Sequence, residues 1–120
     1  MILKSFELAK IKLNNYKFYL FYGDNEGLKE ENIKNLFEKN YQDKIYRYEE
    51  KEILDNTNIF FNSVLTKSFF DNEKLIIINR ATDKIRTTIE NLTEKNPEDI
   101  RIILNSKNLE KKSTLRKLFE

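Results

Sequence analysis

Three short apolar runs stand out along the chain, and they predict buried β-strands. The runs cover residues 18–22, 75–78 and 100–104. Each is too short for an ordinary helix and rich in aromatic or β-branched side chains. The first two show no alternation of polar and apolar positions, which is typical of strands buried on both faces of a parallel sheet. Residues 45–48 form a weaker fourth candidate strand.

Between these runs, apolar residues recur at helical spacing and predict four helices. The expected helices cover residues 26–40, 52–66, 83–94 and 110–119. In each of them the apolar side chains gather on one face of the helix. These side chains are Ile33, Leu36 and Phe37; Phe60, Phe61, Val64 and Leu65; Ile85, Ile89 and Leu92; and Leu115, Leu118 and Phe119.

The alternation of strands and helices predicts a single α/β domain. With right-handed crossovers, that order builds a three-layer sandwich around a mostly parallel sheet. A length of 120 residues is ordinary for one domain. The apolar residues of positions 1–15 fit neither the spacing of a strand nor that of a helix, and we expect a lead-in helix or an irregular segment there. No Gly or Asn cap follows Phe119, so we expect the chain to be a fragment of a longer protein.

Composition then removes several kinds of chemistry. The chain has no Cys and no His, which excludes zinc sites built on those residues, Cys nucleophiles and Ser-His-Asp triads within it. We expect no catalytic residue, metal or cofactor, and the lack of Cys fits a reducing cytoplasm. The chain has 22 Lys and Arg and 20 Asp and Glu, which gives a net charge of +2. A protein that coats DNA has a much larger excess of basic residues. No apolar run approaches about 18 residues, so no membrane span is predicted.

A glycine-containing turn follows the first predicted strand, where a phosphate loop of the form GxxxxGK[ST] would sit. Counting from Gly23, Leu28 replaces the second Gly. Lys29 keeps the Lys, whereas Glu30 replaces the Ser or Thr that binds Mg²⁺. Asn79 follows the second apolar run, where phosphoryl transfer needs a metal-binding Asp. In a phosphate loop the backbone N–H groups come close to the phosphate, and no acidic side chain repels it. Because this segment meets neither condition, we interpret it as an ordinary strand-to-helix turn.

Phe69 and Phe70 lie side by side in an otherwise polar connection that leads into the run at residues 75–78. Two interpretations stay open. In one, a ring caps the end of the sheet while the other is half buried. In the other, the pair is a hydrophobic plug for a partner's pocket. Burial of two Phe rings contributes about 3–6 kcal/mol before the costs of association, enough for a moderate anchor but not for a tight complex.

Three blocks of the sequence, at residues 18–31, 68–78 and 101–113, carry a resemblance to a known family. The first block is similar to a "YLLYG-acid-x-x-x-LKEE" run, and the second to a small-Leu-Phe turn before a strand. Together they resemble the N-terminal domain of the delta subunit of the bacterial DNA polymerase III clamp loader. The resemblance implies that residues 1–120 form a truncated P-loop or AAA+-like domain without a working nucleotide site, lacking the C-terminal lid and collar domains.

The resemblance also implies a role in DNA replication. In that family a Leu-Phe pair enters a hydrophobic pocket on the sliding clamp, the beta subunit, and helps to open the ring for loading onto primed DNA. Carried over, Phe69 takes the Leu position and Phe70 keeps the Phe. We add Ser68 and Leu65 to the expected clamp contacts.

Further partners follow from the same resemblance. Other clamp-loader subunits of the DNA polymerase III holoenzyme would bind through the missing C-terminal domain, and primer-template DNA would be bound in the full complex. Two alternatives stay open, an active nucleotide-binding module and a DNA-binding module that uses the Lys-rich residues 107–112 together with Arg116 and Lys117.

Overall fold

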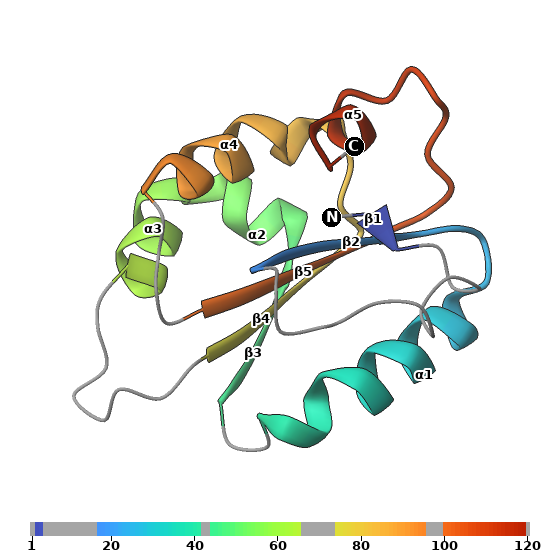
Figure 1. The fold of residues 1–120 in the computed structure, drawn as a ribbon. Coiled ribbons are helices and arrows are strands. Elements are labelled where there is room, and N and C mark those ends of the chain that lie inside the picture. Colours follow the sequence, from blue (N-terminus) through green and yellow to red (C-terminus); the bar gives the residue numbers. More distant parts are fainter. Residues whose placement is uncertain (1, 4–16, 42–43, 66–73, 96–99, 120) are drawn as a thin grey trace.

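The computed structural model describes residues 2–3, 17–41, 44–65, 74–95 and 100–119 (Figure 1). These residues form a five-stranded sheet in the order β1-β2-β5-β4-β3, and every neighbouring pair is parallel. The strands are β1 (Ile2–Leu3), β2 (Phe18–Tyr22), β3 (Ile45–Glu49), β4 (Lys74–Asn79) and β5 (Ile100–Ser106). The predicted α/β sandwich with a parallel sheet is therefore confirmed.

Helices lie on both faces of the sheet, so the fold has three layers with the sheet in the middle (Figure 1). The helix α1 lies on one face, and the helices α2 to α5 lie on the other. The elements are α1 (Glu26–Leu36), the 3₁₀ turn η3 (Glu38–Asn40), α2 (Glu50–Asp55), α3 (Thr57–Leu65), the 3₁₀ turn η4 (Asp83–Ile85), α4 (Arg86–Lys95) and α5 (Thr114–Phe119).

Burial on both faces explains why the central strands read as unbroken apolar runs. Successive residues of β5 point to opposite faces, so that Ile102 and Leu104 join the larger core under α2 to α5, while Ile103 joins the smaller core under α1. In the smaller core, the Phe37 ring lies 4.9 Å from the ring of Tyr19 and 6.1 Å from that of Phe21, between ring centres. The central strand β5 thus stabilises both layers at once.

Three of the expected elements differ from the structure. The expectation for residues 1–15 is wrong at Ile2–Leu3, which form a strand parallel to β2, while residues 4–15 lie outside the described part. The single helix expected over 52–66 is two helices, because Asn56 ends α2 in a non-helical conformation. The helix expected from residue 110 begins only at Thr114.

A carboxylate from a neighbouring element caps the short helix α5. Asp83 in η4 accepts hydrogen bonds from the Ser113 hydroxyl at 2.6 Å and from the Leu115 N–H at 3.0 Å. These hydrogen bonds, that from Ser113 foremost, lower the pKa of Asp83 below its usual value, because they favour the charged form. The start of α5 is therefore fixed to the loop that follows β4.

We expect Asp83→Ala to lower the free energy of unfolding by about 1 kcal/mol, the usual cost of losing a helix cap. Because the pKa of Asp83 is lowered in the folded state, its contribution is complete above the ordinary Asp pKa and is lost as the pH falls through the folded-state value. Urea unfolding of both proteins at neutral pH and below about pH 4 measures this. The control is Asp55→Ala, which removes a carboxylate from the end of α2. Equal stability of Asp83→Ala and the parent at neutral pH would contradict the assignment.

Candidate functional site

The two candidate segments belong to opposite edges of the sheet. Because all strands are parallel, their carboxyl ends share one edge, and the turn from Gly23 to Glu30 follows β2 at that edge. Residues 66–73 follow Leu65, the last residue of α3, and precede Lys74, the first residue of β4, which lies at the amino edge (Figure 1). The degenerate loop and the start of β4 therefore lie at opposite edges of the sheet.

The lysine of the degenerate loop is bound within the domain. Lys29 is 2% exposed, its ammonium lies 2.7 Å from the Glu26 carboxylate, and it donates a 2.5 Å hydrogen bond to the Ser106 carbonyl at the end of β5. A phosphate-binding lysine must instead present its ammonium to the anion. Lys29 therefore joins α1 to β5.

The backbone donors of the same turn also have partners within the chain. The Leu28 N–H donates to the Asn25 side chain at 3.0 Å, and the Glu26 N–H donates to the Asp24 carbonyl at 3.1 Å. Asn25 is thus a helix cap for α1. Gly23 has a φ of +137°, which only Gly adopts readily, so its place is explained by the turn. Few backbone N–H groups of this turn are therefore left to bind an anion.

Beside this turn, the carboxyl edge carries a groove of about 470 Å³ with mixed charge. Its acidic residues are Glu26, Glu30 and Glu49, and its basic residues are Arg80 and Lys107. The Arg80 Nε lies 3.6 Å from the Glu49 carboxylate, and Arg80 has a positive φ of 57°. The excess of carboxylates makes this groove a poor place for a nucleotide triphosphate.

Two amide side chains stand where a nucleotide-hydrolysing domain would have acidic and polar groups for the metal and phosphate. Asn105, in β5, donates from its side-chain amide to the Asn79 side chain at the end of β4, at 3.2 Å. Asn79 is the residue whose position suggested the loss of the metal-binding Asp. Among the residues that the structure describes, no group of three or more acidic, His or Cys side chains could hold a metal ion.

Of the predicted clamp contacts, the structure describes Leu65. Its side chain is half-buried and packs against the larger core, so Leu65 holds the end of α3 in place. Ser68, Phe69 and Phe70 lie outside the described residues, and their role stays a prediction.

A second groove, of about 490 Å³, lies between α3 and the strands β3 and β4. Tyr46, Ser63 and Lys74 are among its lining residues. Lys74 donates to the Ser63 carbonyl at 3.4 Å, and its ammonium lies 5.9 Å from the centre of the Tyr46 ring. Lys74, the first residue of β4, is thus held at this groove.

The sequence argument missed two exposed apolar side chains on this side of the molecule. Ile59 in α3 is 60% exposed, and Tyr46 in β3 is 45% exposed. A signal was present, because residues 56–66 contain no charged side chain in a chain of which 35% is charged. Periodicity alone did not find it.

Comparison with known proteins identifies the family. Residues 19–120 match the family model described as DNA polymerase III, delta subunit. The chain belongs to that family. Neither the curated proteins nor the solved structures gave a match.

The resemblance read from the sequence is thereby confirmed, and the delta-family chain is assigned to DNA replication and to the clamp loader. No helix in the part of this delta-family chain that the structure describes is long and apolar enough to cross a membrane.

We expect Lys29→Met to lower the free energy of unfolding by about 1–3 kcal/mol, because the Ser106 carbonyl would lose its buried donor. Denaturant unfolding measures the change. Lys34→Met, on an exposed lysine of the same helix, is the control, with an expected effect within about 0.5 kcal/mol. If both variants match the parent, Lys29 does not join α1 to β5 in solution.

We expect millimolar Mg-ATP to leave the melting temperature of the delta-family chain unchanged. A ligand that binds the folded state raises its stability in proportion to the logarithm of its concentration, so a thermal shift assay detects even weak binding. A rise in melting temperature that grows with the Mg-ATP concentration and that Lys29→Met abolishes would contradict this expectation.

Proposed function

We propose that this chain is the N-terminal AAA+-like domain, residues 1–120, of a clamp-loader delta subunit, and that it binds the sliding clamp through Phe69 and Phe70. The observation that carries the proposal is the match to the delta family over residues 19–120. Ser68 belongs to the same contact. Leu65 contributes by anchoring the segment, since it packs on the core.

The internal partners of Lys29 support a binding role over nucleotide chemistry. Its ammonium is occupied by Glu26 and by the Ser106 carbonyl, and Asn25 occupies the Leu28 N–H. Leu28 and Glu30 stand where a phosphate loop has Gly and a metal-binding hydroxyl. The domain therefore acts on its partner by binding and needs no nucleotide.

The fold suits this role because both ends of the eight-residue segment 66–73 are fixed. Leu65 packs on the larger core, and Lys74 begins a strand that pairs with Ile100 of β5. A segment with fixed ends loses less conformational freedom when it binds, which lowers the cost of association.

Ring opening follows from a difference in affinity. If the domain binds the open clamp more tightly than the closed one, binding shifts the equilibrium towards opening. A shift from mostly closed to mostly open needs roughly 5 kcal/mol of such preference. Two Phe rings contribute about 3–6 kcal/mol before association costs, so a wider contact around them is needed.

The remaining partners would be the other loader subunits and primer-template DNA, in the cytoplasm. Independent DNA binding by residues 107–112 with Arg116 and Lys117 is the weaker alternative. Arg116 donates to the Leu109 carbonyl and lies over the Tyr22 ring, and Lys112 pairs with Glu110. Two of the basic residues in that region thus have partners within the fold.

We expect the double substitution Phe69→Ala and Phe70→Ala to weaken binding of the matching sliding clamp by at least a hundredfold, because about 3 kcal/mol or more of apolar burial is lost. Isothermal titration calorimetry measures the affinity, and circular dichroism checks the fold. The control is Leu28→Ala, on an exposed leucine at the carboxyl edge of the sheet, whose affinity and stability should both match the parent. A folded double variant with parental affinity would overturn the site. A loss of stability with unchanged affinity would instead favour rings that cap the sheet.

A further inference from the structure

The four residues that follow β4 are hydrogen-bonded to other elements at the carboxyl edge of the sheet, and we call residues 80–83 the β4 loop. The Ala81 N–H donates to the Asn105 carbonyl in β5 at 3.1 Å. The Thr82 N–H and hydroxyl both donate to the Glu50 carboxylate in α2, at 2.8 Å and 2.9 Å. The middle of the loop is therefore bound both to the sheet and to α2.

The last residue of the β4 loop carries the carboxylate that caps α5. Asp83 accepts hydrogen bonds from the Ser113 hydroxyl and from the Leu115 N–H. Ser113 is 6% exposed, and Glu50, the partner of the loop in α2, is 8% exposed. A buried polar group that loses its partner stays without a hydrogen bond, so such contacts are costly to break. The loop thus connects α2 on one side to α5 on the other.

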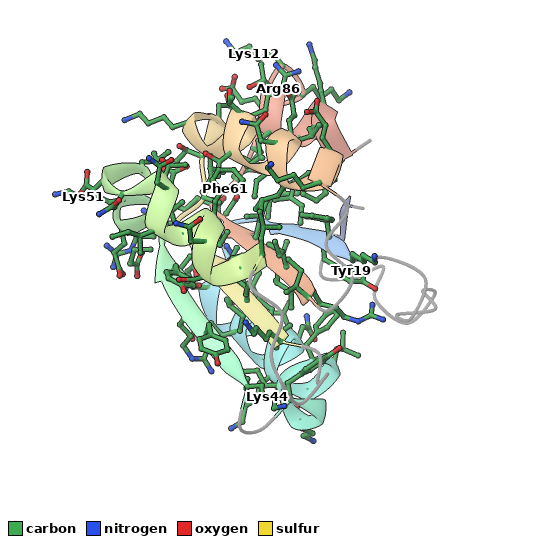
Figure 2. All side chains as sticks on the ribbon, turned by 90° about the vertical axis from the view of Figure 1, so that its left-hand side faces the viewer. Tyr19, Lys44, Lys51, Phe61, Arg86 and Lys112 are labelled. Carbon is green, nitrogen blue, oxygen red and sulfur yellow. The ribbon has the colours of Figure 1, made fainter. Side chains whose placement is uncertain are left out.

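The two helices that the β4 loop connects are separate parts of the layer that covers the larger core (Figure 1). In Figure 2, Lys51 in α2 lies well away from Lys112, which precedes α5. A link through the loop is therefore a link between distant parts of the domain.

The first residue of the β4 loop has a strained backbone. Among the described residues other than Gly, Arg80 is the one with a positive φ, 57°, a region that L-residues enter at a cost. Its side chain is 83% exposed and makes only a 3.6 Å ion pair with Glu49, which is too weak to explain the strain. Strain of this kind persists where surrounding contacts enforce it. Here those are the hydrogen bonds of Ala81, Thr82 and Asp83.

We infer that the β4 loop is a two-state element that couples α2 to α5, with Arg80 held in its left-handed conformation only while both ends of the loop are bound. Loss of the Glu50 contact lets Arg80 relax to a negative φ, which displaces Asp83 and uncaps α5. Loss of the Ser113 contact acts in the other direction, because coupling between two sites is reciprocal. A partner that moves one of these helices therefore changes the stability of the other. This coupling does not depend on the clamp contact.

The test is amide hydrogen exchange, measured by NMR in the 120-residue chain and in its Glu50→Ala variant. We expect the amides of α5 to exchange about tenfold faster in the variant, among them Lys117, which donates to the Ser113 carbonyl at 3.0 Å. The amides of β5 should change by a clearly smaller factor, because core strands exchange on global unfolding. Should Glu50→Ala fold poorly, Ser113→Ala tests the reverse direction, with about tenfold faster exchange expected in α2.

The matched control is Glu52→Ala, which removes another carboxylate from the first turn of α2. Glu52 accepts a hydrogen bond from the Glu49 N–H at 3.2 Å and not from the β4 loop. Exchange in α5 should therefore stay within about twofold of the parent. The same acceleration of α5 in Glu52→Ala as in Glu50→Ala would overturn the inference.

Arg80→Gly tests the strained residue itself, because Gly adopts a positive φ without strain. In the Arg80→Gly background the loop keeps its shape when the Glu50 contact is lost. Adding Glu50→Ala there should change exchange in α5 by no more than about twofold. Three further results would overturn the inference: parental exchange of α5 in Glu50→Ala, equal acceleration of α5 and β5, or an acceleration of α5 that persists in the Arg80→Gly background.

Discussion

Burial of a parallel sheet on both faces is the constraint on which the other features depend. Strands that run in one direction place every strand-to-helix turn at one edge and every helix-to-strand connection at the other. With strands of five to seven residues in β2 to β5, the edges lie about 16–23 Å apart. The degenerate loop and Lys74, which begins β4, are therefore far enough apart for one to change without the other.

The inner and outer faces of helix α3 differ in composition. Phe60 and Val64 fill the larger core, and the exposed positions between them are left without charge. Elsewhere in the described residues, exposed helix positions commonly carry charges, as in the pair of Arg86 and Glu90 in α4. Solubility alone would favour the same pattern on α3, where the exposed positions carry no charge.

Much of the fold could be predicted from the sequence because its main strands are buried on both faces and so give strong local signals. Two residues, Ile2 and Leu3, are too few to show any period, so β1 was missed. The break at Asn56 was missed because apolar residues continue on both sides of it. These failures have the same cause, since each depends on contacts that a local pattern does not contain.

The candidate site was predictable in its chemistry but not in its geometry. The replacements at Leu28 and Glu30 are visible in the sequence, and they were enough to doubt a nucleotide site. The partner of Lys29 was not visible, because Ser106 lies 77 residues further along the chain. Ile59 could not be assigned to the surface, since an apolar residue beside two Phe residues reads equally well as core.

The internal partners of Lys29 have a consequence for how such a domain behaves over time. A nucleotide-binding switch has at least two shapes, one for each phosphate state, and it reports the energy supply of the cell. Here the counter-charge is Glu26, which is part of the polypeptide and cannot be hydrolysed or exchanged. Helix α1 stays bound to β5 whatever the ratio of ATP to ADP, so the link between these two elements does not depend on the energy supply of the cell.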